Sequence, residues 1–261
     1  MISRAKKLLV AVAVIAFAAA IWELSVRMFW PSSRFIVPFS QMLATWPRLG
    51  FGAIAVHIGE TVYRAMLGFV IAAMLGILVG LLIARWRTLE AITRPIIDFL
   101  RPLPSSALIP LATLVPVLGL TERSYLFIIV YGTIWPVLFG TLVGVEHVNQ
   151  TALDSINQLP LSRFGRIWNF TLPEAAPEIF TGLRIALSIS YILAISAELL
   201  LGASKSGLGR FLQTLADGGD YAGVYGCILI VALVGWILNG LFRIGEGKVG
   251  WLRARQAEIG G

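Results

Sequence analysis

The chain has 261 residues, of which 57% are hydrophobic and only 13% are charged. An ordinary soluble domain is about 25% charged, so this composition excludes a typical soluble enzyme and indicates a membrane protein. The formal charge of +7 does not indicate nucleic-acid binding, because the basic residues lie between apolar runs and not on one polar face.

The first apolar run predicts a membrane-spanning helix from Leu8 to about Phe29. A cleavable signal peptide is the alternative interpretation, since three alanines at 18–20 form a possible cleavage site. Residues 31–57 are expected to form an outer connection that contains a short interfacial helix. We therefore divide the chain into an N-terminal helix with its outer connection, 1–57, and a core domain, 58–261.

A second spanning helix is expected from about Thr61 to Ala84. Gly76 and Gly80 form a G-x-x-x-G pair, which lets another helix approach closely. We expect this pair to pack inside the subunit. Glu60 and Arg64 are one helical turn apart and are expected to form an ion pair at the outer edge.

A polar connection at 85–98 precedes a predicted third helix, from about Leu103 to Leu120. Pro104, Pro110 and Pro116 interrupt its hydrogen bonding, and lipid does not satisfy the freed carbonyls. This helix is therefore expected to be central and to line the transport pathway. A kinked packing helix without solute contact is the alternative.

Three further spans are predicted, at Tyr125–Val145, Leu183–Gly202 and Tyr221–Phe242. The loop at 203–220 has the pattern of a short amphipathic helix. Six spans place both termini on one side of the membrane. The loops on that side hold twice as many Lys and Arg as the opposite loops, so both termini are predicted to be cytoplasmic.

The fifth predicted span carries the polar residues Ser188, Tyr191 and Glu198, which are candidates for the pathway or a gate. A carboxylate at the centre of a bilayer costs about 2.5 to 3.5 kcal/mol on insertion scales. Two alternatives stay open. The hydroxyls can bond back to their own helix, and Glu198 can be an interfacial carboxylate that pairs with Lys205 or Arg210.

The stretch 146–184 is the longest polar interruption between the apolar runs. It predicts two short helices, Thr151 to about Leu159 and Arg163 to about Phe170. The pair at 172–173, Leu-Pro, is expected to break the chain after them.

This stretch resembles the signature cytoplasmic loop of the permease subunits of bacterial ABC importers. That signature reads Glu-Ala-Ala, three residues, Gly, nine residues, Ile, one residue, Leu-Pro. Aligned on Leu172 and Pro173, the isoleucine position is Phe170, the glycine position is Pro160, and the Glu-Ala-Ala triplet begins at Asp154. Asp keeps the charge of Glu, whereas Pro in place of Gly is a departure, because the glycine allows a tight turn.

Other segments resemble the branch of this family that imports sulfonates, taurine and nitrate. They follow the family order along nearly the whole chain: Phe35–Pro38, His57–Gly80, Phe99–Gly119, Leu172–Arg184, and Ala197-Glu198 with Gly207-Leu208-Gly209.

The resemblance implies an all-α integral membrane protein with the type I ABC importer permease fold, located in a bacterial inner membrane. It implies three protein partners besides lipid: an ATPase dimer, a second permease copy (a homodimer is expected) and an external solute-binding protein. ATP and Mg²⁺ would be bound by the ATPase, since this chain has no Walker-type loop. The expected solute is a small oxyanion such as a sulfonate, taurine or nitrate.

The resemblance also implies that the loop 146–184 docks on the ATPase. A short helix with an apolar face can lie in a groove on a partner. A loop that only rests on the membrane surface is the alternative. The residues assigned to docking are Asp154, Pro160, Arg163, Phe164, Ile167, Trp168, Phe170, Leu172 and Pro173.

The sequence shows no catalytic constellation and no metal-ligating cluster, and its single cysteine cannot form an internal disulfide. Two other functions remain: a secondary transporter or channel that works alone, and a membrane scaffold that transports nothing. The near absence of ionisable residues in mid-helix disfavours the first, and the proline-rich third segment disfavours the second.

Overall fold

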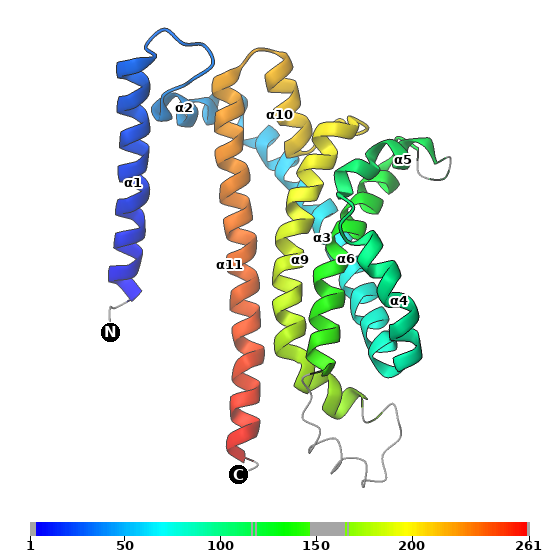
Figure 1. The fold of residues 1–261 in the computed structure, drawn as a ribbon. Coiled ribbons are helices and arrows are strands. Elements are labelled where there is room, and N and C mark those ends of the chain that lie inside the picture. Colours follow the sequence, from blue (N-terminus) through cyan, green and yellow to red (C-terminus); the bar gives the residue numbers. More distant parts are fainter. Residues whose placement is uncertain (1–3, 116, 118, 147–164, 166, 260–261) are drawn as a thin grey trace.

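The computed structural model describes residues 4–115, 117, 119–146, 165 and 167–259, and these residues form helices joined by short links (Figure 1). The helices in chain order are α1 (Arg4–Phe29), α2 (Phe39–Leu49), α3 (Phe51–Arg85), α4 (Arg87–Leu100), η1 (Ser105–Leu108), α5 (Ile109–Leu114), α6 (Glu122–Glu146), η2 (Ile167–Thr171), α9 (Leu172–Leu201), α10 (Leu208–Asp217) and α11 (Tyr221–Ile259).

Among the described residues, four helices are long and apolar enough to cross a membrane: Phe51–Arg85, Glu122–Glu146, Asn169–Leu201 and Tyr221–Gly247. They contain the predicted second, fourth, fifth and sixth spans. We call the end of the bundle that carries α2 and α10 the outer end, and the end with the α3–α4 turn and η2 the inner end. The start of α1 and the end of α11 both point toward the inner end (Figure 1).

The core of the bundle is the group α3, α6 and α9, which pack closely because small residues line their contacts. A Cβ added at Gly76 of α3 would lie 2.8 Å from Cβ of Val137 on α6. Such a Cβ at Gly140 of α6 would lie 3.1 Å from Cα of Gly182 on α9. Close backbone approach at small residues is the usual basis of helix packing in membranes. The prediction that the G-x-x-x-G pair of α3 packs within the subunit is therefore confirmed.

The peripheral helices are held by polar contacts near the outer end. The indole N–H of Trp46 on α2 donates to the carbonyl of Gly226 on α11 at 3.0 Å. Arg48 of α2 also pairs with Asp220, and this contact lowers the pKa of that carboxyl below its ordinary value. Helix α1 stands apart from the bundle (Figure 1). It is joined to α2 through Glu23, which accepts a hydrogen bond from the backbone N–H of Ser40 at 3.0 Å.

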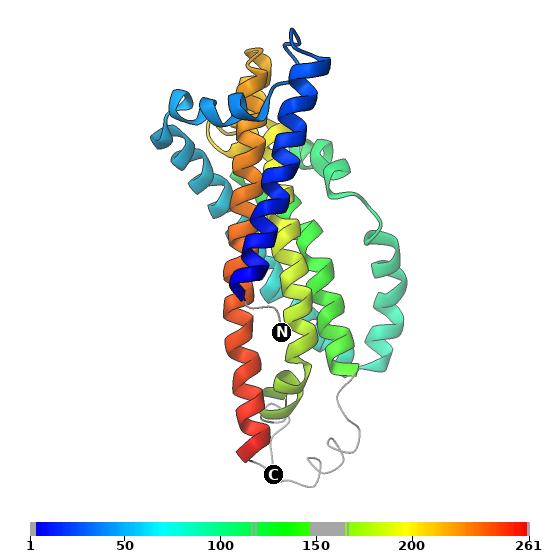
Figure 2. The same ribbon diagram turned by 90° about the vertical axis from the view of Figure 1, so that its left-hand side faces the viewer.

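The predicted third helix, Leu103–Leu120, is wrong. Residues 101–104 are not helical, and only the short η1 and α5 follow them. The stretch 87–100, expected as part of a polar connection, is instead the amphipathic helix α4. Figure 2 shows the non-helical link that carries the chain from the top of α4 to α5. The chain thus returns from the inner to the outer end as a broken segment, because its prolines leave no long run of helical hydrogen bonds.

Two other expectations differ from the structure. The Leu172-Pro173 pair does not break the chain, since η2 leads directly into α9 at this pair and Pro173 lies in the first turn of α9. The expected domain boundary after residue 57 falls within α3. The interfacial and amphipathic helices predicted around residues 41–46 and 211–215 are confirmed as parts of α2 and α10.

We predict that Gly76→Ile destabilises the permease, because the new side chain meets Val137 near the backbone of α6. Overpacking of this kind costs roughly 1 to 3 kcal/mol. The measurement is the free energy of unfolding of the purified protein in detergent. Gly240→Ile on α11 is the matched control, since nothing lies within 4 Å of a Cβ there. Equal stability of the two variants would contradict the packing of α3 on α6.

Candidate functional site

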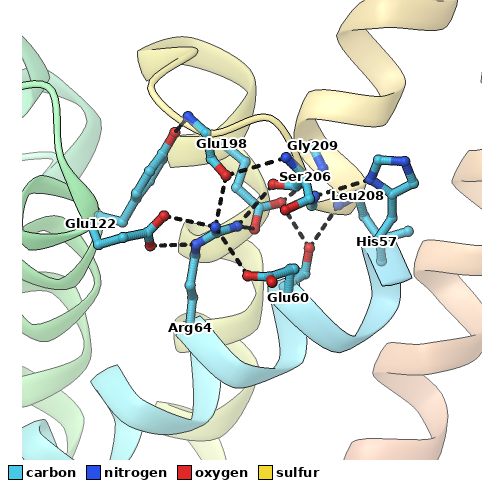
Figure 3. Close-up of polar contacts among 12 residues, drawn as sticks. His57, Glu60, Arg64, Glu122, Glu198, Ser206, Leu208 and Gly209 are labelled. Carbon is cyan, nitrogen blue, oxygen red and sulfur yellow. Dashed lines mark hydrogen bonds and ion pairs between the residues drawn. The ribbon is translucent and has the colours of Figure 1, made fainter. Parts of the chain in front are cut away.

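One arginine of α3 lies among three carboxylates at the outer end of the bundle (Figure 3). The Arg64 guanidinium donates to both carboxylate oxygens of Glu122, with N–O distances of 2.7 and 2.9 Å. It also donates to Glu198 at 2.7 Å and to Glu60 at 3.2 Å. We call these four residues the Arg64 cluster. Because they come from α3, α6 and α9, the cluster fastens the outer ends of the three core helices together.

Glu198 lies at the centre of this arrangement and is completely buried. Besides Arg64, it accepts hydrogen bonds from the Thr61 hydroxyl at 2.8 Å and from the backbone N–H of Gly209 at 3.0 Å. A Cβ on Gly207 would lie 2.4 Å from Cδ of Glu198, and φ at Gly207 is +124°. Glycine is therefore required at 207, both for its backbone conformation and for the approach of the carboxylate.

The cluster also holds the link between α9 and α10. Arg64 donates to the carbonyl of Ser206 at 3.0 Å and to the hydroxyl of Ser204 at 2.8 Å. The N–H of Gly207 donates to Nδ1 of His57 at 3.1 Å. The N–H of Leu208 donates to the Thr61 hydroxyl at 2.7 Å. These contacts fix residues 204–209 against α3 (Figure 3).

The charges of the cluster are divided between the interior and the surface. The side chains of Arg64 and Glu198 are 3% and 0% exposed, whereas those of Glu60 and Glu122 are 42% and 58% exposed. The buried pair is neutral as a whole, and the negative excess faces outward. Described residues form no group of three or more His, Cys, Asp or Glu suited to a metal ion. The cluster can thus hold the helices together and make the electrostatic potential at the outer surface more negative. It contains no nucleophile with an adjacent base.

The hydroxyls predicted for the pathway join α9 to α11. Tyr191 donates to the carbonyl of Val231 at 3.0 Å, and its side chain is buried. Ser188 lies 2.9 Å from the amide oxygen of Asn239, and its contact with its own helix, at Arg184, is longer at 3.4 Å. The hydroxyls of these two residues therefore serve mainly as contacts between helices in this structure.

The predicted pathway prolines lie in the broken segment. Pro104 precedes η1, Pro110 lies in the first turn of α5, and Pro116 lies outside the described residues. The break begins at Arg101, whose guanidinium carbon lies 4.4 Å from the ring centroid of Phe139 on α6. A cavity of about 490 Å³ opens beside this contact, between the break, α6 and α9.

At the inner end, η2 passes directly into α9, so the two form one uninterrupted helical element from Ile167 to Leu201. Of the predicted docking residues in this element, Phe170 and Leu172 are half-buried and Pro173 is exposed. Ile167 and Trp168 are described by their backbone alone. The other docking predictions lie outside the described residues: Asp154, Pro160, Arg163 and Phe164.

Sequence reasoning missed the central contact of the outer end. The alternative partners of Glu198, Lys205 and Arg210, were wrong, because Arg64 is its ionic partner. The Glu60–Arg64 pair was predicted and is confirmed. A usable signal was present, since Arg64 is the one charged residue between 61 and 84, and Glu198 is the one charged residue between 185 and 204.

Comparison with known proteins decides the family. Residues 75–250 match the family described as "Binding-protein-dependent transport system inner membrane component". The chain belongs to this family. It is a multi-pass inner-membrane permease of a binding-protein-dependent ABC importer, and it is not itself an enzyme.

Two relatives and one solved structure illustrate the similarity. The permease is 32% identical to the nitrate import permease protein NrtB of Leptolyngbya laminosa, over 71% of this chain and 65% of that protein. It is 33% identical to the taurine transport system permease protein TauC of Escherichia coli K12, over 70% of this chain and 65% of that protein. A chain of the inward-facing MetNI methionine ABC transporter shares the fold, with a TM-score of 0.56 at 14% identity over 74% of this chain and 96% of that chain.

We predict that Arg64→Met lowers the free energy of unfolding by roughly 3 to 5 kcal/mol, because Glu198 loses its ionic partner and stays buried. Glu198→Gln costs less, since Arg64 keeps Glu122. Adding Glu198→Gln to Arg64→Met is expected to restore part of the loss. The measurement is denaturation of the purified permease in detergent.

Arg48→Met is the control for this series. Its partner is Asp220, and the Arg48 side chain is 58% exposed, so the loss should stay below about 1 kcal/mol. A double variant no more stable than Arg64→Met alone would show that the buried carboxylate is not the source of the cost.

Proposed function

We propose that this permease carries a small oxyanion, such as nitrate, taurine or another sulfonate, into the cell. An external binding protein delivers the solute, and a separate ATPase dimer that binds ATP and Mg²⁺ drives the cycle. Two copies of the permease form the pore. Family membership supports the binding protein and the ATPase as partners. The named substrates of the two relatives, nitrate and taurine, support the class of solute.

The observation that carries the mechanism is the continuous element η2–α9. Thirty residues of α-helix at 1.5 Å per residue give α9 a length of about 45 Å, enough to cross the bilayer. Its inner end continues into the predicted docking segment, and Glu198 near its outer end belongs to the Arg64 cluster. The element stays helical through its internal proline, Pro177, so a displacement at the inner end can be transmitted toward the outer end.

The docking role of the segment 146–184 is part of the proposal. The resemblance to the family signature supports it, and so does the direct entry of η2 into α9. The residues proposed for contact with the ATPase remain those assigned from the signature, Asp154 to Pro173. We propose that Glu198 acts as an anchor between α9 and α3 and not as a group that touches the solute, because its side chain is fully buried and accepts several hydrogen bonds.

Six crossings with cytoplasmic termini are also proposed. The four long apolar helices supply four crossings. Helix α1 supplies one, and the broken segment α4–η1–α5 supplies another between the inner end of α3 and the outer end of α6 (Figures 1 and 2). With this order the direction alternates along the chain. The excess of Lys and Arg in the loops predicted on that side supports a cytoplasmic location for the inner end.

The cycle follows from coupling between two states. ATP binding by the ATPase dimer draws the two docking segments together and favours a pore that opens outward to the binding protein. Hydrolysis lets the pore reopen inward. The nucleotide can shift this equilibrium only as far as the two states differ in their affinity for it.

A stand-alone secondary transporter is the second candidate. Proton-driven transport uses ionisable groups deep in the bundle. The charged side chains that are buried in the described part of the chain are Arg64 and Glu198, and they neutralise each other near one end. This arrangement does not provide a relay across the bilayer.

We predict that the wild-type permease co-purifies with the ATPase encoded beside it, and that Arg163→Asp and Trp168→Asp reduce the retained ATPase at least tenfold, because acidic groups replace the basic and apolar contacts. Lys205→Asp in the outer link between α9 and α10 is the control and should retain the ATPase. A wild type that never retains an ATPase would exclude the proposed coupling.

The solute is tested with the complete importer in proteoliposomes. Uptake of labelled nitrate, taurine and methanesulfonate is measured with binding protein outside and ATP inside. We expect ATP-dependent uptake of one of them that persists when a protonophore removes the pH gradient. Uptake by the permease alone, abolished by the protonophore, would support the secondary transporter instead.

A further inference from the structure

Arg101 is a charged side chain within the depth of the spanning helices and outside the Arg64 cluster. It follows the last residue of α4 and begins the break in the third crossing. Its guanidinium stacks on Phe139, which lies seven residues before the inner end of α6 at Glu146. At 1.5 Å per residue this is about 10 Å from that end of the helix. The positive charge therefore lies beside the apolar stretch of α6 and not at the inner terminus of that helix.

The guanidinium has no ionic partner within the described part of the chain. None of the ion pairs there includes Arg101, and its side chain is exposed in the single subunit. An unpaired charge at this depth is costly against lipid, and such residues face a bundle interior or a water-filled cavity. The cavity of about 490 Å³ that Arg101 lines supplies such a space.

The cavity presents a second donor beside the arginine. Trp135 of α6 lines it, and the indole Nε1–H of Trp135 is buried without a hydrogen-bond acceptor among the described residues. Guanidinium and indole N–H groups are donors only, and buried donors are normally paired. Two donors that lack acceptors therefore line one cavity between the break, α6 and α9.

We propose that Arg101 and Trp135 form a transient contact site for the negatively charged oxygens of the solute as it passes between the broken third crossing and the packed pair α6 and α9. The planar fork of a guanidinium matches two oxygens of a nitrate or sulfonate group, and the ring of Phe139 behind it fixes the plane of the fork. The site thus selects a small oxyanion. This inference rests on the proposed function, which it deepens by assigning the solute contact to residues of this chain.

A carboxylate in the same cavity explains why the site releases its anion. Glu178 of α9 also lines the cavity. Side chains on a helix tilt toward its N-terminus, so this carboxylate leans toward the inner end. An anion that moves inward past Arg101 meets this negative charge. Passage through a pathway requires binding weak enough to allow release, and the pair of opposite charges meets that requirement.

The test uses charge rescue in the complete importer, with its ATPase and binding protein, in proteoliposomes. Labelled nitrate and methanesulfonate are the probes. Arg101→Cys is expected to lower the uptake rate at least tenfold, while the complex still assembles and the binding protein still stimulates ATP hydrolysis. Reaction with 2-aminoethyl methanethiosulfonate, which adds a positive charge, should restore uptake at least threefold. Reaction with 2-sulfonatoethyl methanethiosulfonate, which adds a negative charge, should not.

Two controls accompany this variant. The wild type controls for the reagents, because its single cysteine, Cys227, is fully buried. Arg94→Cys lies on the same helix and does not line the cavity, so its uptake should change with neither reagent.

The outcomes separate the site from the proposed function. If the wild type imports neither probe with its partners present, the proposed function fails. If the wild type imports a probe and Arg101→Cys does so at the same rate, or both reagents restore uptake equally, the Arg101 site is overturned and the proposed function stands. Should the cysteine variant fail to assemble, Arg101→Lys decides: we expect several-fold lower uptake at unchanged ATP hydrolysis, and an unchanged uptake rate would overturn the site.

Discussion

Arg64 and Glu198 are 134 residues apart in the sequence and meet within the apolar bundle, where each alone would be costly. The need to neutralise these two charges determines most of the outer half of the permease. Once Glu198 of α9 pairs with Arg64 of α3, Glu122 places the start of α6 against the same guanidinium, and the link at 204–209 closes over the pair. The helices α3, α6 and α9 and the link 204–209 are thereby fixed in one relative arrangement. Apolar contacts are non-directional and would fix their positions less narrowly.

The inner half follows a different constraint, that of backbone approach. Glycines and alanines bring α6 close to both of its neighbours, so α3, α6 and α9 pack as one unit. The broken third crossing lies outside this unit. The cavity that Arg101 lines lies between the broken crossing and the packed helices. The closely packed group is thus held more tightly than the broken segment. A pathway between the two can open without disturbing the packing of the core.

Sequence reasoning recovered the features that depend on local composition. Long uncharged runs such as 125–145 predicted spans that the structure contains, because length and apolarity alone decide that a helix can cross a bilayer. The prediction for the third crossing is wrong for a local reason as well, since the charged residues of 87–100 indicate a polar connection, whereas the stretch forms an amphipathic helix. The Arg64–Glu198 pair and the Arg101 cavity were missed because they depend on contacts between distant helices. Arg64 and Glu198 are lone charges in apolar runs, which marks them as unusual but does not identify the partner of either.

The link between α9 and α10 is recognised almost entirely through its main chain. The carbonyl of residue 206 and the N–H groups of residues 207, 208 and 209 make the contacts with α3 and α9. Lys205, by contrast, projects an exposed side chain at the outer surface. Outward-facing side chains such as that of Lys205 can therefore change to suit different extracellular partners, while the attachment beneath them, which uses backbone groups and needs glycine at 207, stays intact.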